Sequence, residues 1–270
     1  MIILTPLKRF QLPVVAECIN PDFFQSKTPK ETEALEVWEG NKQKKIEELF
    51  KLKEVEAESL MITIDGDVSE VRRIGANMKS GEIVIHGNAG MHLGEAMEGG
   101  KITVHGNVDG WAGSSMKGGV IEIHGNAGEY LGAPYRGSSQ GMSGGKIVVH
   151  GNVGNEAGAH MRHGLIEIYG CAGQFLGFRM KDGTIYVEKD AEARVGACMI
   201  GGKIIIRGFL ESVLPTFTID DVKSKVKVEE DHTVEGPFYL FLGDLTENGS
   251  GKLYVSREKN PHLSPYEKLL

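Results

Sequence analysis

A 19-residue pattern of apolar residues and glycines runs through the middle of the chain. Each unit has the form G-x-x-M-x-x-G-x-I-x-[IV], and only one of seven units lacks the first glycine. The intervals between the methionines are 19, 19, 26, 19, 19 and 19 residues. The methionines on this lattice are Met78, Met97, Met116, Met142, Met161, Met180 and Met199. A fixed period of this length indicates a repeat architecture.

The last part of each unit alternates between branched apolar and variable residues. The clearest examples are IVIHGN (83–88), ITVHGN (102–107), IEIHGN (121–126) and IVVHGN (147–152). This period of two predicts a half-buried strand, with Ile83 and Val104 facing inward and Thr103 and Glu122 facing outward. Nineteen residues are too few for a strand–helix–strand unit. We therefore predict an all-β fold, a right-handed parallel β-helix (solenoid) with 19-residue coils.

Two further rows share a register across the repeats. An inward apolar row consists of Ile74, Leu93, Ala112, Leu131, Ala157, Leu176 and Val195. A row at the corner after each strand consists of Asn88, Asn107, Asn126 and Asn152. We interpret the asparagines as an amide ladder at corners that tolerate a left-handed backbone.

The flanks break the period, which divides the chain into three parts. Residues 1–60 are predicted to form an N-terminal cap of small α/β character, with a capping box at Thr28 starting a helix near 29–37. Residues 61–210 hold the repeats, with a seven-residue insertion between Gly132 and Met142 that predicts an outward loop. Residues 211–270 are predicted to form a C-terminal β extension, with two strands around an Asn-Gly turn within 236–255 and an extended tail.

Composition and charge exclude several classes of protein. The chain has 37 acidic against 30 basic residues, a net charge of −7, which argues against nucleic acid as a partner. The three cysteines, Cys18, Cys171 and Cys198, have no C-x-x-C spacing, so we expect no iron–sulfur cluster on this chain and a reduced, cytoplasmic location. The N-terminal apolar run is too short for a signal peptide or a membrane span.

A column of histidines is the main candidate for a metal-binding site in the sequence. His86, His105, His124 and His150 share one register. Metal ligands must converge on one point, about 2.0–2.1 Å from a zinc-like ion, whereas side chains stacked in register are parallel. The row also begins with Asp65 and continues as Tyr169, Glu188 and Arg207, so it does not maintain a ligand set. We therefore predict a solvated or interface column rather than a metal site.

A second outward row carries aromatic residues at its middle and charges at its ends. It consists of Arg73, His92, Trp111, Tyr130, Glu156, Phe175 and Arg194. This distribution is typical of a protein interface with a polar rim, although local packing beneath a terminal segment explains it equally well. In both cases Trp111, Tyr130 and Phe175 are expected to be covered. P-loop, G-x-S-x-G and H-E-x-x-H motifs are missing, so we predict no catalytic, cofactor-binding or metal-binding residue.

The repeats resemble a known family. The coils GEIVIHGNAG (81–90) and GGKITVHGNV (99–108), the insertion YRGSSQGMSGG (135–145) and the VWEGN segment (37–41) together resemble the C-subunit of formylmethanofuran dehydrogenase. The resemblance extends over almost the whole chain. The coils are more distantly similar to the carboxy-terminal β-helix domain of glutamate synthase, a far longer enzyme.

The resemblance implies a non-catalytic structural subunit of an oxidoreductase complex. That complex reduces CO2 and fixes it as N-formylmethanofuran, the first step of methanogenesis from CO2. The resemblance also implies that other subunits of the complex carry a tungsten- or molybdenum-pterin, iron–sulfur clusters and a binuclear metal site. The implied partners are a pterin-binding subunit, an amidohydrolase-like formyl-transferring subunit and iron–sulfur subunits.

Two alternatives stay open. One is a subunit of the related bacterial formyltransferase/hydrolase complex. The other is a stand-alone β-helix enzyme, such as an acyltransferase or a polysaccharide-acting protein. Acyltransferase coils have an 18-residue period, and polysaccharide enzymes carry charged clusters along one groove, neither of which matches this sequence.

Overall fold

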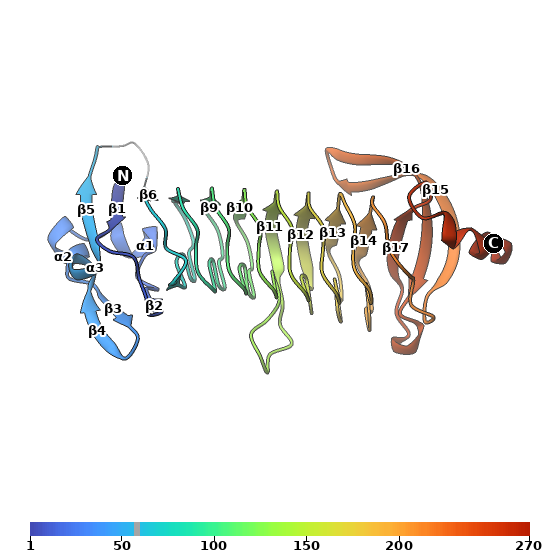
Figure 1. The fold of residues 1–270 in the computed structure, drawn as a ribbon, viewed down its shortest axis with the longest axis horizontal. Coiled ribbons are helices and arrows are strands. Elements are labelled where there is room, and N and C mark those ends of the chain that lie inside the picture. Colours follow the sequence, from blue (N-terminus) through green and yellow to red (C-terminus); the bar gives the residue numbers. More distant parts are fainter. Residues whose placement is uncertain (57–59) are drawn as a thin grey trace.

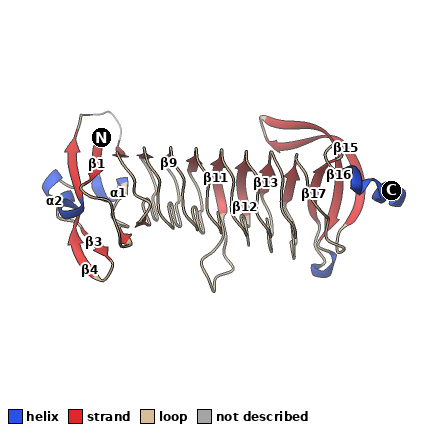
Figure 2. Ribbon diagram, viewed as in Figure 1, coloured by secondary structure: helices blue, strands red, loops and turns tan. Residues whose placement is uncertain are grey.

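The protein is elongated, with its repeats arranged side by side between two different ends. A computed structural model describes residues 1–56 and 60–270. Figure 1 shows an N-terminal module at one end, a row of similar layers in the middle and a C-terminal module at the other end. The helices lie at the two ends, and strands mark the layers between them (Figure 2). Within these residues, no helix has the length and apolar character needed to cross a membrane.

The N-terminal module combines short strands and short helices. Its elements are β1 (Ile2–Pro6), β2 (Val14–Val15), α1 (Pro21–Phe24), α2 (Pro29–Glu33), β3 (Glu36–Glu39), β4 (Lys42–Lys45), α3 (Ile46–Leu49) and β5 (Phe50–Glu54). The predicted capping box at Thr28 is confirmed, because its hydroxyl accepts from the Glu31 amide while the Glu31 carboxylate accepts from the Thr28 amide. The helix ends at Glu33 rather than near residue 37, where β3 has begun.

Each repeat contributes one strand to a continuous ladder. The strands are β6 (Met61–Ile64), β8 (Glu82–Ile85), β9 (Lys101–Val104), β10 (Val120–Ile123), β11 (Ser143–Val149), β12 (His163–Ile168), β13 (Thr184–Val187) and β14 (Lys203–Ile206). Neighbours pair in parallel, and equivalent residues face one another, as Ile83, Ile102 and Ile121 do. The short β7 (Val71–Arg72) pairs with β2 instead.

The C-terminal module continues this ladder and then reverses it. Its elements are β15 (Thr218–Glu229), β16 (His232–Gly243), the 3-10 helix η1 (Leu245–Glu247), β17 (Gly251–Ser256) and the 3-10 helix η2 (Pro261–Leu269). Strand β17 pairs in parallel with β14 and antiparallel with β16. The predicted Asn-Gly turn is confirmed between β16 and β17, where Asn248 has a φ of 53°. The tail is not extended as predicted, because η2 folds back and buries Leu263.

The fold-class prediction needs correction. The all-β class is consistent with the structure, but a right-handed parallel β-helix was the wrong description. The strands form one mixed 13-stranded sheet, in the order β15-β16-β17-β14-β13-β12-β11-β10-β9-β8-β6-β1-β5, and a four-stranded sheet, β4-β3-β2-β7. Apart from the short β7 in the first repeat, only one segment of each repeat is a continuous strand. A second line of contact consists of isolated bridges such as Val68 with Ala89. Because antiparallel strands at both ends join the same ladder, the sheet is mixed rather than parallel throughout.

The core is built from rows of equivalent apolar side chains. All seven lattice methionines are fully buried, and the predicted inward row from Ile74 to Val195 is at most 2% exposed. Val104 and Ile83 are fully buried and face inward, as predicted. Thr103 lies on the outer face of the sheet, in register with Val84 and Glu122, but its side chain is buried there too. The interior is close-packed, so the repeats position outer residues at fixed spacing.

Candidate interaction surface

The predicted aromatic row is a corner of the repeat that has a left-handed backbone. Its seven members, Arg73, His92, Trp111, Tyr130, Glu156, Phe175 and Arg194, have φ values between 58° and 66°. This conformation is uncommon for residues other than glycine. At these corners it recurs in every repeat, so the surrounding hydrogen bonds impose it. Each side chain consequently leaves the backbone in the same direction as its equivalent in the next repeat.

The structure brings two of the three predicted interface residues together. The rings of Trp111 and Tyr130 stack with centroids 4.5 Å apart and planes 13° apart, and His92 stacks on the other face of Trp111 at 5.5 Å. Phe175 lies farther along the row, beyond the repeat that carries Glu156, and the guanidinium of Arg194 lies 4.9 Å from its ring centroid. Trp111, Tyr130 and Phe175 are each partly exposed, so their predicted covering by a partner stays a prediction.

The insertion loop adds residues that the sequence analysis did not select. The loop projects from the start of β11 (Figure 1), and its Tyr135 ring lies 5.3 Å from the His92 ring and 6.0 Å from that of Trp111. The guanidinium carbon of Arg136 lies 6.0 Å from the Trp111 ring centroid. Tyr135 itself is 53% exposed. The only signal in the sequence was a tyrosine and an arginine inside the single insertion. We call Trp111, Tyr130, Tyr135 and Phe175 with their neighbours the aromatic surface.

Buried polar atoms without hydrogen-bond partners gather beneath the aromatic surface. Within the described residues, five such side-chain atoms occur, and four of them are His92 Nδ1, Glu95 Oε2, Trp111 Nε1 and Ser114 Oγ. Two of these are nevertheless ion-paired, because Glu95 Oε2 lies 3.4 Å from His92 Nδ1 and 3.3 Å from Arg73 Nε. Burial and the positive charge of Arg73 and Arg72 lower the pKa of His92, while burial raises the pKa of Glu95 against the opposing effect of Arg73. In the part of the chain that the structure describes, Trp111 Nε1 and Ser114 Oγ have neither a hydrogen-bond nor an ion-pair partner, and such buried groups are costly, so a new hydrogen bond to them would stabilise this surface.

The histidine column forms a second outer feature. The His86 and His105 rings stack at 5.1 Å with planes 2° apart, those of His124 and His150 stack at 4.9 Å, and His150 continues onto Tyr169 at 5.6 Å. The in-register stacking expected from the sequence is therefore present. A carboxylate lies beside this column, however, and the sequence analysis did not consider it.

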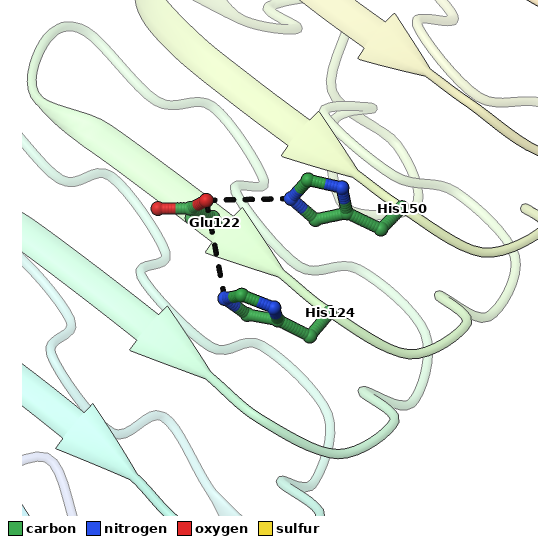
Figure 3. A group of neighbouring side chains, drawn as sticks. All are labelled: Glu122, His124 and His150. Carbon is green, nitrogen blue, oxygen red and sulfur yellow. Dashed lines mark hydrogen bonds and ion pairs between the residues drawn. The ribbon is translucent and has the colours of Figure 1, made fainter.

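The Glu122 carboxylate lies beside two stacked imidazoles of the column, those of His124 and His150 (Figure 3). Its Oε1 lies 3.3 Å from His150 Nε2 and 3.9 Å from His124 Nε2, and its Oε2 lies 3.2 Å from Lys101 Nζ. The hydrogen bond with His150, helped by Lys101 and opposed by burial, holds the pKa of Glu122 below its usual range. The relevant signal was available in the sequence, since Glu122 lies two positions before His124 and therefore on the same face of the strand.

A third cluster joins the repeats to the C-terminal hairpin. The Glu167 side chain is 3% exposed, and its carboxylate oxygens lie 2.9 Å from His232 Nδ1 and 2.9 Å from Lys146 Nζ. Lys146 also pairs with Glu229 of β15. Sequence reasoning could not find this cluster, because no repeat rule places the β15–β16 hairpin over the ladder. The ion pairs instead indicate how the hairpin is held there.

A basic cavity of about 930 Å³ opens between the hairpin and the strands. Its lining includes Lys146, Lys203, Lys223, Lys225, Lys227 and Lys252, together with Asp182 and Glu229. Burial lowers the pKa of Lys203, and the neighbouring charges of Lys252 and Lys227 add to this effect. The charge of the cavity lining is thus positive, whereas the net charge of the chain is negative.

The chain is similar to several known proteins. No protein-family model matches the chain. The C-subunit of a molybdenum-containing formylmethanofuran dehydrogenase from Methanothermobacter marburgensis is 45% identical over 92 residues, which cover 34% of this chain and 23% of that protein. The chain is therefore aligned with only about a quarter of the length of that relative.

Two other matches extend along nearly the whole chain. The C-subunit of a tungsten-containing formylmethanofuran dehydrogenase from Methanococcus maripaludis is 49% identical over 258 residues, covering 93% of this chain and 95% of that protein. A chain in the crystal structure of the formyltransferase/hydrolase complex from Methylorubrum extorquens, determined with methylofuran, superimposes with a TM-score of 0.84. It is 26% identical, and the match covers 94% of this chain and 99% of the other. This chain therefore belongs to the family of formylmethanofuran dehydrogenase C-subunits.

Proposed function

We propose that the chain is a non-catalytic structural subunit of a formylmethanofuran dehydrogenase, the complex that reduces CO2 and fixes it as N-formylmethanofuran. Its relatives are named as the C-subunit of that enzyme, one of them at 49% identity over 93% of the chain. The proposed partners are the pterin-binding, formyl-transferring and iron–sulfur subunits. We further propose a cytoplasmic location for the assembly.

The observation that supports a structural role most directly is the continuous, in-register ladder. Strands β6 and β8 to β14 pair without a break, and β17 extends the same ladder at its C-terminal end. Each added repeat moves the two ends apart by about 4.8 Å, the spacing of neighbouring strands. A ladder of this kind sets a fixed distance between surfaces at its ends. In our proposal it holds the CO2-reducing subunit and the formyl-transferring subunit in fixed relation.

The cofactors of such a complex fit poorly on this chain. An iron–sulfur cluster is usually held by four cysteine thiolates. The chain has three cysteines, Cys18, Cys171 and Cys198, and all three are unbridged thiols. Neither cluster of potential metal ligands found in the described residues includes a cysteine. We therefore propose that the iron–sulfur clusters belong to other subunits. The proposed placement of the metal-pterin and the binuclear site on other subunits rests on the family resemblance alone.

A second candidate is a subunit of a formyltransferase/hydrolase complex. The structural match to a chain of that complex, with a TM-score of 0.84, favours it. The identity of 26% is, however, well below the 49% shared with the dehydrogenase relative. Mass spectrometry of the native complex separates the two candidates, because only the dehydrogenase is expected to co-purify with iron–sulfur subunits and a metal-pterin.

Removing one complete repeat tests the scaffold role. Deletion of residues 79–97 joins Met78 to Glu98, so that β6 can pair with β9 in the same register and the strand pairing from β9 onward is unchanged. We expect a cooperatively folded chain that no longer assembles with the other subunits when co-expressed with them. Full assembly and full activity of the deletion variant would refute the proposal.

A matched control keeps the number of repeats. In this control, residues 79–97 are replaced by a second copy of residues 98–116, so the sequence changes but the spacing of the ends does not. This variant is expected to assemble. If both variants fail to assemble, the local sequence rather than the spacing is responsible, and the fixed-distance role is wrong.

A further inference from the structure

We infer that Glu122, His124 and His150 form a binding site for a divalent transition-metal ion of the zinc class. The three residues each offer one ligand atom, and these atoms all lie within 4.8 Å of one another. Nothing in the proposed scaffold role requires this cluster. The inference is therefore independent of the proposed function.

The two separations that involve Glu122 are close to those of a metal-bound set. Ligand bonds of about 2.0–2.2 Å in a tetrahedral site place neighbouring ligand atoms about 3.3–3.6 Å apart. Glu122 Oε1 lies 3.3 Å from His150 Nε2 and 3.9 Å from His124 Nε2. The fit therefore needs the Glu122–His124 separation to shorten by a few tenths of an ångström and the two imidazole nitrogens, which lie within 4.8 Å of each other, to approach as well. Rotation of the exposed histidine side chains can bring this about.

The carboxylate overcomes the geometric objection to the histidine column. Stacked imidazoles alone do not converge, and the planes of His124 and His150 are 27° apart. Figure 3 shows both rings directed toward the same oxygen of Glu122, which provides the point of convergence. Both side chains are 42% exposed, so rotation about the Cβ–Cγ bond can aim each Nε2 at an ion near that oxygen.

A carboxylate shared by two imidazoles occurs at one place in the column, whereas Asp65 lies 3.8 Å from the single imidazole of His86. The position two residues before each column histidine is Val84, Thr103, Glu122 or Val148, so only one of the four offers a carboxylate. The next carboxylate on this register, Glu167, follows in the repeat where the column residue is Tyr169, and it is engaged by His232 and Lys146. The ligand set is thus a local feature superimposed on the repeat.

The second oxygen of Glu122 is already positioned. Lys101 Nζ lies 3.2 Å from Oε2, which leaves Oε1 directed at the imidazoles. Partners of this kind orient metal ligands. Two imidazoles and one carboxylate suit zinc, cobalt, nickel or copper better than magnesium or calcium, which prefer oxygen alone. Three protein ligands also leave a coordination position open for water or for a donor from outside the chain.

Titration of the purified, EDTA-treated chain with ZnCl2 tests the inference. Calorimetry is expected to show one saturable site, and CoCl2 is expected to give the visible absorption of a tetrahedral cobalt centre. Glu122→Gln, His124→Ala and His150→Ala should each weaken zinc binding at least 10-fold, since even the loss of an orienting partner weakens metal sites by about 10–100-fold. Because the three side chains lie on the outer face, circular dichroism should show unchanged folding.

The controls come from the same column. His86→Ala and His105→Ala remove stacked imidazoles that have no carboxylate two positions before them, and both should keep zinc affinity within about twofold. Two outcomes would overturn the inference. One is the absence of a saturable site, and the other is an equal loss of affinity in the control variants, which would indicate nonspecific binding along the column.

Discussion

The side-chain oxygen of Asn107 accepts a hydrogen bond of 2.8 Å from the backbone N–H of Asn126, nineteen residues later. In the same way, the side-chain oxygens of Asn88, Asn126 and Asn152 accept hydrogen bonds from the backbone N–H groups of Asn107, Asn152 and Cys171, respectively. The asparagine row is therefore a ladder from side chain to backbone rather than from amide to amide. None of these asparagines has a positive φ, so the left-handed backbone that asparagine tolerates is not used at these corners.

Replacement of Asn107 by alanine should destabilise the chain by about 1 kcal/mol, because the Asn126 N–H loses its acceptor. Chemical denaturation monitored by circular dichroism measures this loss. Asn107→Asp is the matched control, since Asp190 occupies the equivalent place and accepts from the N–H of Phe209 at 2.7 Å. The aspartate variant should be more stable than the alanine variant. Equal stability of the two variants would show that the hydrogen bond contributes nothing.

Gly113 is placed where a side chain would be doubly unfavourable. Its φ is +63°, and a Cβ there would lie 2.5 Å from Cδ1 of Ile147 in the next repeat. Gly113→Ala should therefore destabilise the chain by about 2–4 kcal/mol, from backbone strain and overpacking together. The loss of stability is measured as the decrease in the free energy of unfolding, obtained by urea titration.

Two further variants separate the two causes at Gly113. Gly137 also has a positive φ, +86°, but a Cβ there meets nothing within 4 Å, so Gly137→Ala should destabilise by only about 1 kcal/mol. Adding Ile147→Val to Gly113→Ala removes the clashing methyl group and should recover part of the stability. A double variant less stable than Gly113→Ala alone would contradict the packing explanation.

The pairing of the repeats was predictable from the sequence, because the methionine lattice and the strand alternation both require equivalent residues to face one another. Ile102 opposite Ile121 is one such pair. The sheet as a whole was not predictable. Strand β5 lies outside the period, and its antiparallel pairing with β1 depends on contacts between distant segments. The antiparallel pair β16–β17 was predicted around its turn, but its place on the ladder beside β14 was not. The proposed divisions after residues 60 and 210 stay predictions.

The candidate sites were predictable only where they follow the period. The stacking of Trp111 on Tyr130 follows from shared register, as does the histidine column. Tyr135 reaches the same surface from a loop whose path no periodic rule describes. The pairing of Glu167 with His232 joins residues 65 positions apart and needs the hairpin to be placed first.

Acid should weaken the N-terminal module through Glu39, a buried carboxylate that lies 2.6 Å from Lys8 Nζ and 2.9 Å from Lys44 Nζ. Hydrogen bonds from Lys8 and Lys44 lower the pKa of Glu39 in the folded chain. A lowered pKa contributes stability above the ordinary glutamate value of about 4.3, and this contribution is lost as the pH falls through the lowered pKa. Wild type should therefore lose more stability than Glu39→Gln on acidification.

Urea midpoints measured between about pH 6 and pH 3 check this prediction, since that interval spans the ordinary glutamate pKa. Wild type should be the more stable of the two at the upper end, and the gap should close toward the lower end. The exposed Glu54 on β5 provides the control, and Glu54→Gln should follow the wild-type pH profile. A gap between wild type and Glu39→Gln that does not change with pH would exclude this role for the carboxylate.

The aromatic surface should decide whether the chain assembles with its partner subunits. Trp111→Ala and Phe175→Ala each remove a partly exposed ring, and large aromatic residues carry a disproportionate share of binding energy in protein interfaces. Each variant should lower co-purification with the other subunits at least 10-fold while the isolated chain stays folded. Trp38→Ala is the matched control, because Trp38 is a 49% exposed aromatic residue on the separate four-stranded sheet. If Trp38→Ala impairs assembly and Trp111→Ala does not, the partner binds the N-terminal module and the aromatic surface is not its docking site.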